Sequence, residues 1–137
     1  MATKRQSPEQ ALEQQVKNEV GQALAYTATH VQATFDLLQG QIYTAMQAAG
    51  FWEGAQDNVP AKIALIHSEL SEALEADRKG VEADDKIPEF NGLEAELADT
   101  VIRILDLAGR LELRLGEAIV AKMMFNLTRE RKHGKAY

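Results

Sequence analysis

Apolar residues recur along most of the chain at intervals of three or four positions, with polar residues between them. This spacing is typical of amphipathic α-helices, and the strict alternation that indicates β-strands is missing. The pattern therefore predicts an all-α fold. Five helical stretches are expected, at residues 7–39, 41–49, 59–79, 92–109 and 116–132.

The residues at three expected helix starts support this division. Ser7 with Gln10, and Asn91 with Glu94, have the spacing of a capping box, in which each side chain accepts a hydrogen bond from the other residue's backbone N–H. Asn58 is expected to cap the third helix, because its side chain can accept a hydrogen bond from the first turn.

Two glycines are expected to limit the helices. Glycine weakens a helix interior, so we expect one long N-terminal helix with a break near Gly40. Gly80 follows the third stretch, where a terminal glycine readily adopts the left-handed backbone conformation that ends a helix.

Composition narrows the functional classes. With 137 residues the chain has the length of one domain, and its 45% hydrophobic content is enough for a core. The absence of cysteine excludes a disulfide scaffold, a cysteine zinc site and a thiol nucleophile. The net charge of −6 argues against a nucleic-acid partner. No apolar run reaches the roughly 20 residues of a membrane helix, and no secretory signal follows Met1, so we expect a soluble, cytoplasmic protein.

Four carboxylates have a spacing that suits a metal site. Glu69 and Glu72 lie one helical turn apart in the third stretch, and Glu96 and Asp99 repeat this spacing in the fourth. If these two helices pack in antiparallel fashion, the four groups converge and repel one another. A hard divalent cation such as Mg²⁺ would relieve this repulsion, because it prefers oxygen ligands.

Two other interpretations of these carboxylates are open. Glutamate pairs three residues apart are common on solvated helix faces and then bind nothing. A di-iron bundle requires the E-x-x-H spacing on two helices. Glu130 and His133 alone have that spacing, in the basic C-terminal tail, so di-iron chemistry is disfavoured.

A second group of residues is suited to phosphate. Lys122, Asn126 and Arg129 follow one another at spacings of four and three, which places them on one face of the fifth helix. A lysine, an amide and an arginine in line can bind phosphate oxygens. The alternative is that the cations simply complement the dipole at the helix C-terminus. An acidic metal cluster facing a cationic surface would meet the requirements for cleaving a phosphoanhydride.

Three segments combine these residues into a longer pattern: KIALIHSELSEALEADRKG at 62–80, IPEFNGLEAELAD at 87–99 and KMMFNLTR at 122–129. Together they resemble the MazG-like all-α nucleoside triphosphate pyrophosphohydrolases. The hallmark of that superfamily is E-E-x-x-E, a spacer and E-x-x-D, followed on a later helix by K-x-x-x-N-x-x-R. The resemblance covers residues 41–137, which would form the pyrophosphohydrolase domain. Residues 1–40 would be an N-terminal helical extension.

The resemblance implies a Mg²⁺-dependent enzyme, in which Mn²⁺ can substitute for Mg²⁺. It would hydrolyse a (d)NTP to the (d)NMP and pyrophosphate, as part of nucleotide-pool house-cleaning. The family pattern implies that the metal ligands are Glu69, Glu72, Glu96 and Asp99. It implies that Lys122 and Asn126 hold the nucleotide, and that Arg129 lies near the phosphates.

The helices are too few and too short to close a core alone. We therefore expect a four-helix-bundle core, with the additional long N-terminal helix, that is completed by oligomerisation as a homodimer or homotetramer.

One departure from the family pattern leaves the catalytic base open. Ser68 replaces the first glutamate of E-E-x-x-E, so Glu69 or Glu72 is expected to accept the proton of the attacking water. Trp52 lies where related proteins contact the nucleobase, but a tryptophan of the core is an equal alternative. Two other functions stay open: a non-enzymatic helical oligomerisation or adaptor module, and a hydrolase of a non-nucleotide phosphoribosyl compound.

Overall fold

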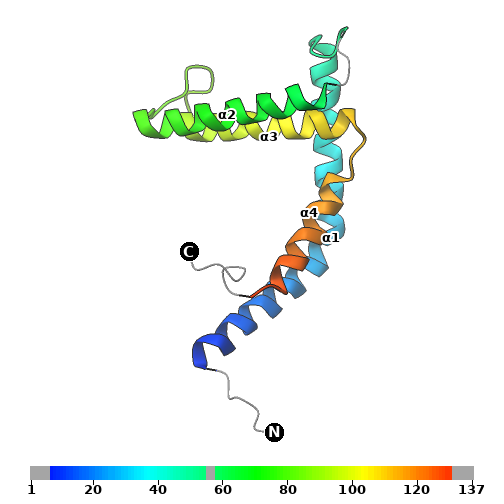
Figure 1. The fold of residues 1–137 in the computed structure, drawn as a ribbon, viewed down its shortest axis with the longest axis vertical. Helices are drawn as coiled ribbons and strands as arrows, with labels where there is room; N and C mark the ends of the chain where they lie inside the picture. The colour runs from blue at the N-terminus through cyan, green and yellow to red at the C-terminus, as the bar shows by residue number, and fades with distance from the viewer. Residues whose placement is uncertain (1–6, 55–57, 131–137) are drawn as a thin grey trace. The chain divides into compact units, whose positions relative to one another are not determined.

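The computed structural model describes residues 7–54 and 58–130. Over these residues the chain forms four helices and no strand, which confirms the predicted all-α fold (Figure 1). None of these helices combines the length and the apolar character needed to cross a membrane. The helices are α1 (Pro8–Ala48), α2 (Val59–Lys79), α3 (Gly92–Arg110) and α4 (Leu115–Leu127).

The predicted helix starts are confirmed by their hydrogen bonds. The backbone N–H of Ser7 donates to Gln10 Oε1 at 2.9 Å, and the N–H of Gln10 donates to Ser7 Oγ at 3.2 Å. Asn58 Oδ1 accepts from the backbone N–H three residues further on, at 3.1 Å. Asn91 and Glu94 form a complete capping box, with N–H to oxygen distances of 2.8 and 3.0 Å. Local sequence signals therefore fix where these helices begin.

The predicted break at Gly40 is wrong. Helix α1 continues through Gly40 to Ala48 and joins the first two expected stretches. A single glycine costs a helix only about 1 kcal/mol relative to alanine, and the flanking residues are good helix formers. The carbonyl of Gly40 also accepts a hydrogen bond of 2.8 Å from the hydroxyl of Thr44. Gly80, in contrast, ends α2 as predicted, with φ at 63°.

Helix α4 ends earlier than predicted. Its last residue is Leu127, and Thr128 follows as the C-terminal cap. The backbone N–H groups of Thr128 and Arg129 close short turns onto carbonyls three residues back, at 3.0 and 3.2 Å. The final residues of the expected fifth helix, 131 and 132, lie outside the described residues.

The chain divides into two compact units, of which the first comprises residues 1–36 and 114–137. Its described part pairs the N-terminal portion of α1 with α4. A Cβ atom at Gly116 would lie 2.8 Å from Phe35 Cβ, so glycine allows α4 to approach α1 closely at this point. Leu24 and Val120 are buried in this unit.

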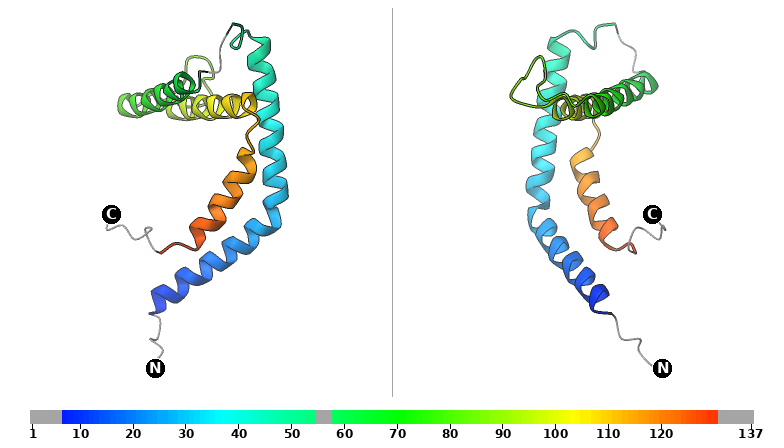
Figure 2. Two further views of the ribbon diagram at one scale, coloured as in Figure 1. Left: turned by 45° about the vertical axis from the view of Figure 1, so that its right-hand side comes forward. Right: turned by 90° about the vertical axis from the view of Figure 1, so that its left-hand side faces the viewer.

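The second unit comprises residues 37–113 and contains α2, α3 and the end of α1. Helices α2 and α3 lie side by side, because the loop between them turns the chain back on itself (Figures 1 and 2). Gly109 brings α3 against α1: a Cβ there would lie 2.6 Å from Tyr43 Cβ and 3.0 Å from the carbonyl of Gln39. The buried apolar side chains of this unit are Ala73, Ala95, Leu105 and Ala108.

Many large apolar side chains of α2 and α3 stay exposed. The buried set in this unit is dominated by alanine, and Leu105 is its one large aliphatic member among the described residues. Small side chains bring helices close together but bury little apolar area. The exposed apolar residues of the two helices are Ile63, Leu65, Leu70, Leu74, Leu93, Leu97 and Val101.

Candidate metal centre

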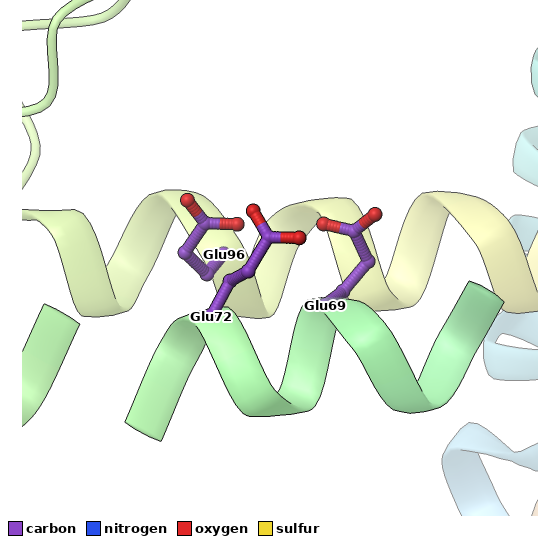
Figure 3. A group of neighbouring side chains, drawn as sticks. All are labelled: Glu69, Glu72 and Glu96. Atoms are coloured by element: carbon purple, nitrogen blue, oxygen red, sulfur yellow. The ribbon is translucent and has the colours of Figure 1, made fainter. Parts of the chain in front are cut away.

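Three of the four predicted metal ligands converge in the second unit. Glu69 and Glu72 extend from α2 and Glu96 extends from α3. One carboxylate oxygen from each residue lies within 4.8 Å of the others. Figure 3 shows the three carboxyl groups on the same side of the helix pair. The fourth predicted ligand, Asp99, is exposed on α3 one turn beyond Glu96 and lies outside this group of three.

The three carboxylates differ in their access to water. Glu69 is buried, with 4% of its surface exposed, Glu96 is half-buried, and Glu72 is exposed. Glu69 is buried because it extends from α2 beside Ala73, one turn further on, where the helix packs against α3. The cluster therefore extends from the helix interface to the solvent.

The electrostatics of the cluster favour a bound cation. The pKa of Glu96 is raised above its ordinary value of 4.5, first by burial and then by the negative charges of Glu72, Glu69 and Asp99. The ammonium of Lys86 acts in the opposite direction but does not cancel these effects. A divalent ion would replace the mutual repulsion of the carboxylates by attraction.

The donor set fits a hard divalent ion. Carboxylate oxygens are the ligands that Mg²⁺ and Mn²⁺ prefer. A Mg²⁺ ion with ligands at about 2.1 Å holds its oxygens no more than about 4.2 Å apart. Small side-chain movements are therefore enough for Glu69, Glu72 and Glu96 to reach one ion, and water and substrate would complete the coordination.

One residue of the site was missed by sequence reasoning. Arg103, on α3, donates a hydrogen bond from Nε to Oε1 of Glu69 and forms an ion pair with it. Arg103 lies seven residues after Glu96, which places both on one face of α3. This i, i+7 spacing is the signal that could have identified it.

The predicted phosphate-binding residues belong to the first unit. Lys122 is exposed on α4, with Nζ 5.5 Å from the ring centre of Phe125. Asn126 is half-buried, and its Oδ1 is buried without a hydrogen-bond partner in the described structure. Arg129 follows the end of α4, and its backbone carbonyl accepts a hydrogen bond of 2.8 Å from Lys17 Nζ. Lys122, Asn126 and Arg129 are thus placed in a different unit from the carboxylate cluster.

Trp52 contacts several residues of the second unit. Its indole N–H donates a hydrogen bond of 2.9 Å to Oδ1 of Asp106, which is 5% exposed. Lys62 Nζ lies 3.8 Å from the centre of the indole ring, and the Arg110 guanidinium lies 5.3 Å from it. Tyr43 packs edge-on at 6.1 Å between ring centres. These contacts attach the loop after α1 to α2 and α3, and a nucleobase contact by Trp52 stays a prediction.

Comparison with protein-family models, with curated proteins and with solved structures finds no significant match to this chain. The family resemblance therefore rests on the motif residues themselves. Among these, Glu69, Glu72 and Glu96 lie close enough together that they could hold a metal ion.

Proposed function

We propose that this chain is a Mg²⁺-dependent nucleoside triphosphate pyrophosphohydrolase of the MazG-like type, active in nucleotide-pool house-cleaning. The observation that carries the proposal is the convergence of Glu69, Glu72 and Glu96, from two helices, within 4.8 Å. The motif resemblance supplies the reaction: a (d)NTP and water give a (d)NMP and pyrophosphate.

In this proposal the carboxylates bind the metal ion, and one of them accepts the proton of the attacking water. Glu69, Glu72 and Glu96 bind the ion, and Asp99 is the proposed fourth ligand. When bound, Mg²⁺ supplies charge neutralisation at the phosphates and lowers the pKa of a water molecule. Glu72 is exposed, whereas Oε1 of Glu69 is already bonded to Arg103. Glu72 is therefore the better placed of the two glutamates to accept the proton of the attacking water.

The covalent step is a displacement at the α-phosphorus. The water oxygen forms a bond to this phosphorus, and the bond from phosphorus to the bridging oxygen breaks. The water proton passes to the carboxylate, and pyrophosphate leaves with the electron pair of the broken bond. The resemblance implies that Lys122 and Arg129 offset the charge of the pyrophosphate, that Asn126 holds the nucleotide and that Trp52 contacts the base, and these roles stay predictions.

The proposed enzyme is a homodimer or homotetramer. The exposed apolar residues of α2 and α3 support this, because apolar surface of this extent is stabilised when another chain covers it. Light scattering is expected to show a species of at least twice the chain mass of 15.1 kDa. A monomer at all concentrations would contradict the proposed assembly.

The same exposed surface favours a second candidate, a helical adaptor without catalysis. The two candidates differ in their response to metal. A ligand that binds only the folded state raises the melting temperature, whereas an adaptor without a metal centre would melt at the same temperature with and without Mg²⁺.

The deciding experiment combines binding with turnover. Melting curves are recorded in EDTA and in millimolar Mg²⁺ or Mn²⁺, and a panel of ribo- and deoxyribonucleoside triphosphates is scored for pyrophosphate release. The proposal expects a higher melting temperature with metal and pyrophosphate release from at least one triphosphate. Failure of both would leave the adaptor as the better candidate.

A further inference from the structure

The ion pair between Arg103 and Glu69 sets a buried carboxylate beside a cation of the chain itself. The side chain of Glu69 is 6% exposed and that of Arg103 is 34% exposed. A buried carboxylate without a cation is costly, so this pair stabilises the cluster when no metal is bound. The guanidinium of Arg103 is itself only partly exposed, so it stays close to the cluster that a metal ion would enter.

We propose that Arg103 is a positioning residue that holds Glu69 before metal binds and then competes with the divalent ion for it. This inference rests on the proposed metal centre. Arg103 donates to Oε1 of Glu69, one of the two carboxylate oxygens through which Glu69 could bind a metal ion, and both cations would lie at the same acidic cluster. A metal ion that binds here would therefore either displace the guanidinium from Glu69 or be repelled by its positive charge.

Two effects of removing Arg103 act in opposite directions. A partner that orients a metal ligand commonly contributes about 10- to 100-fold to metal affinity, and this contribution would be lost. Repulsion between a guanidinium and a divalent ion a few ångströms apart should lower the affinity for that ion by more than about 100-fold at the effective dielectric constant of a protein surface. Repulsion is the larger effect, so the Arg103→Gln variant is expected to bind Mg²⁺ about tenfold more tightly.

Loss of Arg103 should lower the stability of the metal-free protein. Without Arg103 the buried Glu69 has lost its cation, so Arg103→Gln is expected to lower the melting temperature in EDTA. The double variant Arg103→Gln/Glu69→Gln removes the unpaired charge as well and should recover much of this loss. Arg103→Lys keeps the charge and should stay near wild type in both measurements.

The experiment measures Mg²⁺ affinity by calorimetry and melting temperature in EDTA for the wild type and these variants. Arg78→Gln is the matched control, because it removes one positive charge from an exposed position of α2. Tighter Mg²⁺ binding together with a lower metal-free melting temperature, in Arg103→Gln alone, supports the inference. A merely structural ion pair would instead weaken Mg²⁺ binding when it is lost.

Three results overturn the inference, and each has a distinct meaning. If the wild type binds Mg²⁺ and Arg103→Gln binds it equally or more weakly, competition by Arg103 is excluded. The proposed metal centre is then still supported. An unchanged melting temperature in EDTA excludes the holding role. Absence of Mg²⁺ binding in both the wild type and Arg103→Gln overturns the proposed function and the competition together. Binding that is measurable only in Arg103→Gln supports competition.

Discussion

The indole N–H of Trp52 donates a hydrogen bond of 2.9 Å to the buried carboxylate of Asp106, and so joins the loop after α1 to the C-terminal part of α3. This hydrogen bond fixes the orientation of the indole ring. It also gives the carboxylate a donor, which the carboxylate requires because it is buried away from water.

Replacement of Trp52 by phenylalanine is expected to destabilise the protein by about 1–3 kcal/mol, because a buried carboxylate loses a hydrogen bond. Chemical denaturation measures this effect. Phe51→Leu is the control, since Phe51 is an exposed neighbour in the same loop. Equal stability of Trp52→Phe and the wild type would show that the hydrogen bond contributes little.

The charge of Glu72 is expected to be essential for turnover. Glu72→Gln should reduce pyrophosphate release by at least about 100-fold, the scale of losing a key electrostatic group, while the helical circular dichroism spectrum is retained. Glu75→Gln is the control, one turn further along α2 at an exposed position. We expect Asp99→Asn to have a similar effect to Glu72→Gln. Near-normal rates in both site variants would show that the ligands are assigned incorrectly.

The stability of the metal-free protein should depend on the protonation of Glu96. Its pKa is raised above 4.5, so the folded state binds this proton more tightly than the unfolded chain does. The corresponding stability is fully present below the ordinary pKa and is lost as the pH rises through the folded-state pKa. Glu96→Gln stays neutral, so in EDTA it should raise the melting temperature at about pH 7.5 and change it little at about pH 4.

Saturating Mg²⁺ should reverse the effect of Glu96→Gln at neutral pH, because the variant then lacks a ligand. Glu89→Gln, an exposed substitution in the loop before α3, is the control and should behave like the wild type in both buffers. A decrease in melting temperature for Glu96→Gln in EDTA at both pH values would contradict the expected repulsion.

Two glycine-to-alanine substitutions should have opposite effects. At Gly109 the new Cβ would meet Tyr43 Cβ at 2.6 Å, so α3 must move away from α1 and the protein should lose about 1–3 kcal/mol of stability. At Gly40 nothing lies within 4 Å of the new Cβ, so alanine should stabilise α1 by about 0.5–1 kcal/mol. Melting of the two variants side by side tests this, and destabilisation by Gly40→Ala would contradict the continuous helix.

Features that depend on neighbouring residues could be predicted from the sequence. The caps at Ser7, Asn58 and Asn91 need only residues within one helical turn, and all three form as expected. The predicted break at Gly40 is wrong because the small cost of one glycine is offset by the favourable helix-forming residues on both sides of it.

The site could be predicted only in part, because helix rotation is not a local property. Glu69 and Glu72 share a face by spacing alone, but Glu96 joins them, rather than Asp99, because of the way α3 is turned against α2. The pairing of Arg103 with Glu69 depends on the same rotation and on a separation of 34 residues. The i, i+7 spacing places Arg103 on the same face of α3 as Glu96, but it does not determine that Arg103 pairs with Glu69 on α2.

The graded exposure of the three glutamates has a consequence for ion selection. Glu72 is the most exposed of the three and Glu69 the most buried, so an ion from bulk water is expected to contact Glu72 before Glu69. The ion would exchange water molecules of its hydration shell for carboxylate oxygens one after another. A compact inorganic ion could contact the buried Glu69 as well as the exposed Glu72, whereas a bulky organic cation would contact mainly Glu72, so the size of a cation as well as its charge would affect its binding.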